Sequence, residues 1–350
     1  MNKRVIVSII GTVGVPACYG GFETLVENLL DDNEKDKDIT VYCSSKSYSE
    51  KISSYKNAKL HYIPLNANGA QSIPYDIWSL CHAVWKGTDN ILLLGVSGAI
   101  CLPFIRLFSN VKIVTNIDGL EWKRAKWNSL IKRFLKFSER LAVKYSDVVV
   151  ADNAAIADYV KSEYNVSSEV IAYGGDHAIV NDLRPSDDGY ALVLCRIEPE
   201  NNVELILEAF SQTDKELKFI GNWDSSEFGR TMKAKYDQFE NIEIIDPIYD
   251  IKTLFEIRTK CSLYVHGHSA GGTNPSLVEM MHFKKNIIAF DCNYNRASTE
   301  DKAEFFLSTE KLVKLVESSE VIDNGSTMQE IAERRYTWAI VKEQYFSLFN

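Results

Sequence analysis

HGHSAGGTNPSLVE, residues 266–279, is the stretch that decides the fold of this chain. A short apolar run, Ser262 to Val265, precedes it and is typical of a buried strand. Asn274 is a good helix N-cap and Pro275 suits the first helical position, so we expect a helix from Pro275 to Phe283. A strand, a glycine-rich loop and a helix N-terminus direct backbone N–H groups and the positive end of the helix dipole at one anion.

Glu279 lies about one turn into this predicted helix, where its carboxylate can accept hydrogen bonds from sugar hydroxyls. An anion-binding loop beside such a carboxylate predicts a site for a nucleotide diphosphate. The alternative is a tight strand–helix connection whose glycines only turn the chain. A second glycine-bearing loop, Gly11 to Gly21, follows the apolar run Val5 to Ile10 and favours the ligand-binding interpretation. Its spacing fits neither GxGxxG nor GxxxxGK[ST], so we do not expect a nucleoside triphosphatase.

The composition is that of a water-soluble globular chain of 350 residues, long enough for two domains. A formal net charge of −9 argues against general nucleic-acid binding. Seven cysteines are scattered without paired spacing, which predicts reduced thiols in a cytoplasmic protein. We expect no signal peptide, because the apolar run after the basic start is short. Ile91 to Phe108 is broken by glycines and Pro103, so we interpret it as a strand, a turn and a short helix rather than a membrane span.

Strand and helix patterns alternate in both halves of the chain, which predicts an α/β protein with two doubly wound parallel sheets. A polar break at Asn181 to Gly189 marks the expected junction. The predicted domains are residues 1–180 together with a C-terminal crossover helix at about 330–350, and residues 181–329. That last helix is part of an aromatic-rich run, Thr327 to Phe349. Ligands bind such sheets at the carboxyl ends of the strands, so we expect both glycine loops to face one central cleft. The predicted strands are 5–10, 39–43, 60–63, 91–94, 111–116, 147–151, 191–195, 217–220, 242–245, 262–266 and 287–290.

Two charged residues follow predicted strands directly. Arg196 comes after the run Ala191 to Cys195, where a guanidinium can fork onto a diphosphate; a surface ion pair is the alternative. Asp118 ends the run from Val111 and precedes Gly119, a position from which an acid can orient or deprotonate a hydroxyl. Its alternative role is to cap the following helix.

The sequence offers no convincing metal site. His266 and His268 alternate on an extended segment without a third partner. Asp36 and Asp38 lie in a charged loop, where a solvated turn is the better interpretation. There is also no Ser-His-Asp signature and no hydrolase-type pair of carboxylates.

Trp122 to Lys144 carries eight basic side chains and one glutamate, a local charge of +7 in an acidic chain. Apolar and aromatic residues are interleaved with these charges. A basic amphipathic helix of this kind suits an anionic membrane surface. The alternative is a solvated basic face over an ordinary core helix.

Four motifs resemble those of one enzyme family: YGGFET at 19–24, DGLEWKR at 118–124, RIEPENN at 196–202 and the stretch 266–279. With them the whole chain resembles a GT-B glycosyltransferase of the large retaining family four, and within it the bacterial rhamnosyltransferases of capsule and O-antigen assembly. Two positions depart from the broad family. Asn201 stands where that family has a lysine, and Gly271 where it has the first glutamate of a Glu-x7-Glu pair. The narrower subgroup resembles this chain at both places, which indicates specialisation.

The resemblance implies a GT-B fold and transfer of a sugar, L-rhamnose, from a nucleotide diphosphate, dTDP-L-rhamnose, to a hydroxyl of a lipid-linked saccharide. It also implies retention at the anomeric carbon, independence of metals and cofactors, and a peripheral location on the inner face of the plasma membrane. Asp118, Arg196 and Glu279 are the implied catalytic residues. The implied substrate- and nucleotide-binding residues are Gly20, Gly21, Glu23, Asn201, Gly221, His268, Gly271, Gly272, Thr273, Asn274 and Ser276. A GT-B nucleotide-sugar epimerase and a non-catalytic nucleotide- or sugar-binding module are the alternatives.

Overall fold

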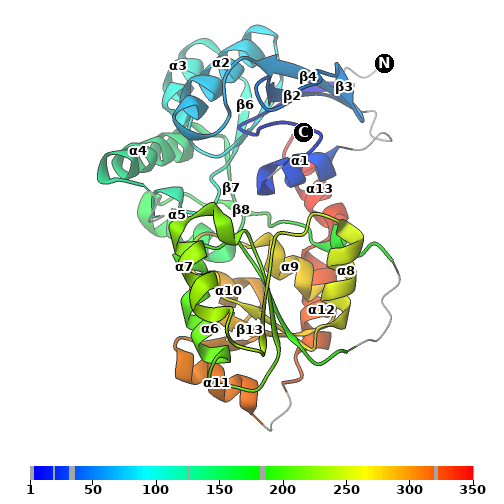
Figure 1. Cartoon of the computed structure of the whole chain (residues 1–350). Helices are drawn as coiled ribbons and strands as arrows, with labels where there is room; N and C mark the ends of the chain where they lie inside the picture. Colours follow the sequence, from blue (N-terminus) through cyan, green and yellow to red (C-terminus); the bar gives the residue numbers. More distant parts are fainter. Residues whose placement is uncertain are drawn as a thin grey trace. The chain divides into compact units, whose positions relative to one another are not determined.

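The computed structural model describes residues 4–18, 20–30, 36–123, 127–181, 187–318 and 322–349. The chain divides into two compact units, and Figure 1 shows its course. Unit 1 comprises Met1–Ala172 and Trp338–Asn350, and unit 2 comprises Tyr173–Thr337. Each unit is a largely parallel sheet covered by helices, which confirms the predicted α/β fold class with two doubly wound sheets.

Unit 1 is built, in its described part, on an eight-stranded sheet with the order β3-β4-β2-β1-β5-β6-β7-β8. All neighbours pair in parallel except β3, which runs antiparallel to β4. The central strands consist almost entirely of buried residues, as expected for a sheet covered on both faces. The strands are β1 (Val5–Ile10), β2 (Lys37–Ser44), β3 (Ser54–Tyr55), β4 (Ala58–Ile63), β5 (Asn90–Leu94), β6 (Lys112–Asn116), β7 (Val148–Ala151) and β8 (Glu169–Val170).

The strand order assigns the helices of unit 1 to the two faces of the sheet. The chain moves in one direction from β1 to β2, and in the opposite direction from β4 to β5 and onward to β8. Because crossovers between parallel strands are right-handed, α1 covers one face while α2 to α5 form a layer on the other. The last helix, α13, packs against α1. The helices of unit 1 are α1 (Gly21–Leu29), α2 (Ser72–Trp85), α3 (Leu102–Phe108), α4 (Ser129–Tyr145), α5 (Ala154–Tyr164) and α13 (Trp338–Ser347).

Unit 2 has, among its described residues, a six-stranded parallel sheet with the order β11-β10-β9-β12-β13-β14. Its core includes Phe219, Trp223 and Ile288. The strands are β9 (Ala191–Leu194), β10 (Leu217–Ile220), β11 (Ile242–Ile245), β12 (Leu263–His266), β13 (Asn286–Phe290) and β14 (Glu304–Phe306). The helices are α6 (Val203–Phe210), α7 (Glu227–Tyr236), α8 (Ile251–Lys260), α9 (Pro275–Met281), α10 (Asn293–Ser298), α11 (Thr309–Glu317) and α12 (Gly325–Arg335). Short 3₁₀ turns across both units are η1 (Gly69–Gln71), η2 (Ala99–Cys101), η3 (Glu121–Lys123), η4 (Asp176–Ala178), η5 (Pro199–Asn201) and η6 (Trp223–Ser225).

The C-terminal segment, expected as one helix-like run, forms two helices. The helical conformation ends at Tyr336, whose carbonyl oxygen accepts from the Gly175 amide at 2.7 Å and from Nε2 of His282 at 3.0 Å. Because that carbonyl is used by other parts of unit 2, it is not available to continue the helix. α12 therefore belongs to unit 2, and α13 returns to unit 1.

The boundary of unit 2 also lies earlier than the polar break at Asn181 to Gly189. Unit 2 begins at Tyr173 because the segment that follows packs on α9. A Cβ on Gly175 would lie 2.6 Å from the Val278 carbonyl oxygen, so only glycine permits this approach. Residues 182–186 of the predicted break lie outside the described residues.

The apolar segment from Ile91 to Phe108 forms β5, η2 and α3, as the sequence predicts. Across the described ranges, every helix is too short or too polar to cross a bilayer.

Candidate functional site

The loop between β12 and α9 has the predicted strand–loop–helix form. Oδ1 of Asn274 accepts the Ser276 amide at 3.0 Å, which confirms the expected N-cap. The helix ends at Met281, two residues before the predicted Phe283. Gly271 has φ +103, in the left-handed region that favours glycine, and it precedes Gly272 and the buried Thr273.

Hydrogen bonds join this loop to the segment after β9. The imidazole Nδ1 of His268 lies 2.6 Å from Oδ1 of Asn201, and Nδ2 of Asn201 donates to the Arg196 carbonyl at 2.6 Å. The Ser269 amide and hydroxyl both reach the Glu200 carbonyl, at 2.9 and 2.7 Å. Asn201 is buried. Asn201 therefore connects two loops at the carboxyl edge of the sheet, and its side chain has partners within the protein.

Arg196 keeps a largely solvated side chain. It is 48% exposed, and Nη1 lies 3.9 Å from Oε1 of Glu198, the outer limit for an ion pair. Its guanidinium is thus available for an anionic ligand at the end of β9. Gly221, at the end of β10, has a packing reason to be glycine, because a Cβ there would lie 2.4 Å from Cδ1 of Ile197.

Glu279 is held by two partners that the sequence did not indicate. Arg258, a buried residue of α8, contacts Oε2 through Nη2, and Nε2 of His177 lies 3.5 Å from Oε1. Burial alone raises the pKa of the Glu279 carboxyl, but Arg258 and His177 together lower it below the ordinary value of 4.5. Glu279 is therefore an oriented carboxylate at neutral pH. No local pattern around Arg258 or His177 distinguishes them from surface residues.

His266 is buried at the end of β12. Burial and the neighbouring His268 lower its pKa well below 6.5, so its imidazole is neutral at physiological pH. Its Nδ1 lies 3.4 Å from the Tyr264 hydroxyl. His266 is thus a core residue of the sheet, and His268 is buried as well.

The first glycine loop, in unit 1, is folded back on itself by Glu23. Oε1 of this buried carboxylate accepts from Oγ1 of Thr12 at 2.9 Å and from the Val13 amide at 2.7 Å. Gly20 has φ +109 and caps α1, which begins at Gly21. Glu23 thus shapes the loop, and the substrate contact that the resemblance implies for it stays a prediction. Tyr19 lies outside the described residues.

Asp118 lies just beyond the carboxyl end of β6, as predicted. Its backbone is left-handed, with φ 62, and its amide donates to Oδ1 of Asn116 at 2.8 Å. Asx side chains tolerate this conformation better than most. The short 3₁₀ helix η3, rather than α4, is the next helical element after Asp118, so Asp118 does not cap a long helix.

The basic run after Asp118 is only partly a surface feature. Lys136 points inward, with Nζ 3.0 Å from Oε1 of Glu163, 3.5 Å from Oε1 of Glu139 and 4.7 Å from the Trp122 ring centroid. Buried Glu139 accepts from Nε1 of Trp122 at 2.9 Å and from the Tyr159 and Tyr164 hydroxyls. Lys136 therefore belongs to an internal network, contrary to its expected place on a membrane-facing surface. Residues 124–126 of this run lie outside the described residues.

The described residues contain no group of three or more His, Cys, Asp or Glu side chains that could hold a metal ion. Asp38 lies in β2 rather than in the expected loop, and it forms a solvent-exposed ion pair with Lys59 at 2.8 Å.

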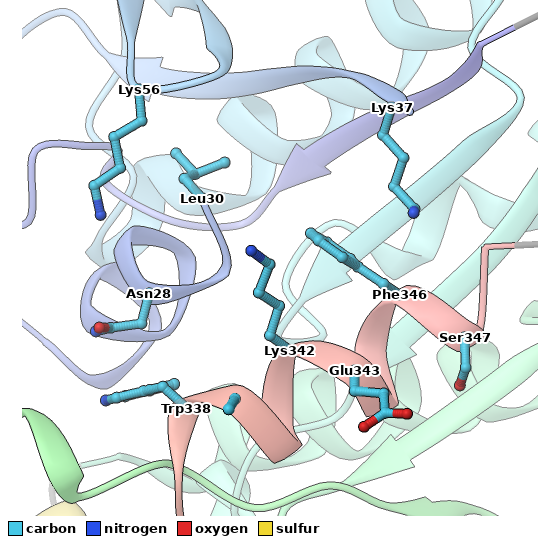
Figure 2. A pocket seen from close by; sticks show the side chains of 10 residues that line it. Asn28, Leu30, Lys37, Lys56, Trp338, Lys342, Glu343, Phe346 and Ser347 are labelled. Atoms are coloured by element: carbon cyan, nitrogen blue, oxygen red, sulfur yellow. The ribbon is translucent and has the colours of Figure 1, made fainter. Parts of the chain in front are cut away.

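A pocket of about 750 Å³ lies elsewhere in unit 1, between α1 and α13 (Figure 2). Lys37 lies over the Phe346 ring at 4.7 Å, and Lys56 donates to the Glu27 carbonyl at 2.7 Å. None of the residues predicted for the functional site lines this pocket.

Comparison with known proteins divides the chain at nearly the same place as the structure does. Residues 178–334 match the family described as Glycosyl transferases group 1, and residues 4–176 match a domain of unknown function, DUF1972. Among curated proteins, none matches this sequence.

Solved structures of similar fold cover almost the whole chain. Sucrose-phosphate synthase from Thermosynechococcus elongatus is 14% identical with a TM-score of 0.78, covering 99% of this chain and 98% of its own. Anabaena Alr3699/HepE in complex with UDP and glucose is 13% identical with a TM-score of 0.71, covering 99% of each chain. The lipopolysaccharide outer core galactosyltransferase WaaB, in its apo form, is 12% identical with a TM-score of 0.69, again covering 99% of each. Identities this low show the fold, which is GT-B.

Proposed function

Because the chain belongs to the glycosyl transferases group 1 family and is a glycosyltransferase of the GT-B fold, we propose that it transfers L-rhamnose from dTDP-L-rhamnose to a lipid-linked saccharide. The acceptor is a growing surface polysaccharide, of the capsule or O-antigen kind. The enzyme works at the cytoplasmic face of the plasma membrane, retains the anomeric configuration and uses no metal.

One observation carries this proposal: an exposed guanidinium, a glycine-bearing loop and an oriented carboxylate lie at the carboxyl edge of the unit 2 sheet. Arg196 follows β9 with an exposed guanidinium, and the loop to Thr273 follows β12. Glu279 is fixed beside that loop by Arg258. A guanidinium with backbone amides suits a diphosphate, and an oriented carboxylate suits the two hydroxyls of a sugar.

In the proposed reaction the bond from the anomeric carbon to the diphosphate breaks, and the acceptor oxygen bonds to that carbon. The acceptor proton is released, and the nucleoside diphosphate leaves with the electron pair of the broken bond. Arg196 and the loop stabilise the charge of the leaving diphosphate, Glu279 holds the sugar of the nucleotide, and Asp118 positions a reacting sugar. Gly20 and Gly21 keep the approach to the backbone of the first loop open.

The primary experiment is a thermal-shift panel of nucleotide sugars. Selective binding of dTDP-L-rhamnose stabilises the protein by about 2.7 kcal/mol at a ligand concentration near 100 times its dissociation constant. UDP- and GDP-sugars at the same concentration serve as matched controls. Stabilisation by one of them alone would replace the proposed donor.

Turnover then distinguishes the alternative functions. A transferase releases dTDP when a polyprenyl-diphosphate saccharide is supplied, and a rhamnosylated lipid appears. An epimerase converts the donor into an isomeric nucleotide sugar without an acceptor. A binding module gives a thermal shift and no product.

A further inference from the structure

We propose that the outer surface of the α2–α4 layer of unit 1 inserts into an anionic phospholipid bilayer, with α3 as the penetrating element. This inference deepens the proposed function and rests on it for its biological purpose, since a lipid-linked acceptor requires the enzyme at a membrane. The sequence predicted a contact through the basic run Trp122 to Lys144 alone. The proposed surface adds α2 and α3, and insertion of apolar side chains becomes the main contribution to membrane binding.

The ridge on α3 is the first observation. Phe104, Leu107 and Phe108 are 65%, 73% and 86% exposed. Their spacing of three and four residues places them on one side of the helix. Transfer of such side chains from water into an apolar environment is favourable. Three of them on a helix of seven residues form an apolar ridge whose exposure to water is unfavourable.

Arg106 explains why this ridge is held outward. Its Nε donates to the Tyr145 carbonyl and its Nη1 to the Val111 carbonyl, each at 2.8 Å. Nη2 pairs with Asp147 at 2.6 Å. The only charged residue of α3 is thus used to attach the helix to the ends of α4 and β6. The ridge is consequently a fixed feature of the surface.

A mixed stripe on α4 is the second observation. Leu130 and Phe137 are exposed at 75% and 56%, and Arg133, Arg140 and Lys144 are exposed as well. These five residues follow one another at intervals of three or four, so they share one face of the helix. Apolar and basic side chains alternate along that face, the arrangement of a helix that lies in the headgroup region of a membrane.

The topology places both features in one layer. The steps from β4 to β5, β6 and β7 run in one direction, so α2, α3 and α4 cover the same face of the sheet. α3 and α4 are in contact, and Trp78 and Trp85 add exposed indoles on one side of α2. Of the twelve exposed large apolar side chains among the described residues, seven lie on these three helices.

The chemistry of this surface favours a bilayer as its occupant. The exposed charges along the α4 stripe are all positive in a chain of net charge −9, so they complement anionic headgroups specifically. Exposed tryptophans and phenylalanines beside cations are the composition that occurs at the level of lipid headgroups. Membrane binding that is purely electrostatic weakens as salt is added, whereas binding through an apolar ridge inserted in the bilayer persists.

The experiment measures binding of the full chain to vesicles of equal parts phosphatidylglycerol and phosphatidylcholine by flotation, at low and high salt. We expect the wild type to float under both conditions, more tightly at low salt. A variant with Phe104→Ser, Leu107→Ser and Phe108→Ser should lose affinity by on the order of tenfold for each side chain that inserts, at both salt concentrations. A variant with Arg133→Glu, Arg140→Glu and Lys144→Glu should lose mainly the salt-sensitive part.

The matched control carries Tyr249→Ser, Ile251→Ser and Leu307→Ser, three apolar residues of unit 2 that are also exposed. It should float as the wild type does, and all variants should keep the wild-type melting temperature.

Equal flotation of the α3 variant and the wild type would overturn the proposal. So would self-association of the wild type in ultracentrifugation that the α3 variant abolishes while vesicle binding is absent, because the ridge would then cover a second copy. Donor binding is measured separately with soluble nucleotide sugar. If the wild type floats with the vesicles but binds no donor, the proposed function is refuted and this surface still stands.

Discussion

Tyr345, in the last helix of the chain, lies 2.7 Å from Asn116 and accepts a hydrogen bond from its side-chain amide. The same amide group presents Oδ1 to the backbone N–H of Asp118, at 2.8 Å. Both Asn116 and Tyr345 are buried. The C-terminal segment therefore holds, through one side chain, the left-handed turn on which the candidate Asp118 sits.

Tyr345→Phe tests whether this chain of hydrogen bonds positions Asp118. The variant leaves a buried amide donor without its partner, at a cost of about 1 kcal/mol, and frees Asn116 to rotate away from Asp118. We expect kcat to fall about tenfold while the KM for the donor changes little, measured by release of nucleoside diphosphate. Tyr42→Phe is the matched control, because Tyr42 is a buried tyrosine of unit 1 whose hydroxyl lies 2.9 Å from Nδ1 of His82. Equal losses of kcat in the two variants would mean that Tyr345 only stabilises the fold.

Glu279→Ala should weaken binding of the nucleotide at least tenfold. Charge-assisted hydrogen bonds to a sugar diol contribute about 1.5–3 kcal/mol each, and the variant removes both acceptors. Isothermal titration calorimetry with the nucleoside diphosphate measures the change. An affinity equal to that of the wild type would refute the assignment of Glu279 to the nucleotide.

Arg258→Met should invert the pH dependence of stability that Glu279 contributes. In the wild type the pKa of Glu279 lies below 4.5, so its contribution is complete above pH 4.5 and is lost as the pH falls through the lower folded value. Without Arg258, burial is the dominant influence and raises that pKa, so the variant loses stability as the pH rises above 4.5. Urea unfolding between mildly acidic and neutral pH measures the slope. A slope of unchanged sign would show that His177 alone keeps Glu279 ionised.

Lys136→Glu should destabilise unit 1, whereas Arg133→Glu should not. Burial lowers the pKa of Lys136, but its hydrogen bonds to Tyr164 and Glu163 and the charge of Glu139 outweigh this and raise it. Reversing that charge beside buried Glu139 should cost roughly 3–5 kcal/mol, while an exposed substitution changes stability by about 0.5 kcal/mol or less. Thermal unfolding of the two variants provides the comparison. Similar melting temperatures would place Lys136 on the solvated surface after all.

Transfer should persist in excess EDTA. The leaving diphosphate is expected to be stabilised by Arg196 and the amides around Thr273, which no chelator removes. The assay is product formation before and after dialysis against EDTA. Complete loss of activity, restored by magnesium or manganese, would reveal a metal requirement.

The amino-acid sequence by itself determined the order and type of the elements and the two loops at their strand ends. Apolar runs such as the one that forms β12, and the Asn274 cap, depend on residues within a few positions of one another. Periodicity and capping are local properties, which is why the strand–loop–helix form was predictable within two residues. Local patterns did not reveal that the side chains of Glu23 and Lys136 have partners in other parts of the fold.

Only the tertiary structure decided what surrounds the site and what the surface presents. Glu279 and Arg258 are 21 positions apart, and Asn116 and Tyr345 are 229 apart. Such pairs meet because whole elements pack against one another, a relationship that no local pattern carries. The ridge on α3 arises in the same way: the sequence shows an apolar helix, and only the attachment of Arg106 to β6 and α4 decides which side of that helix remains in solvent.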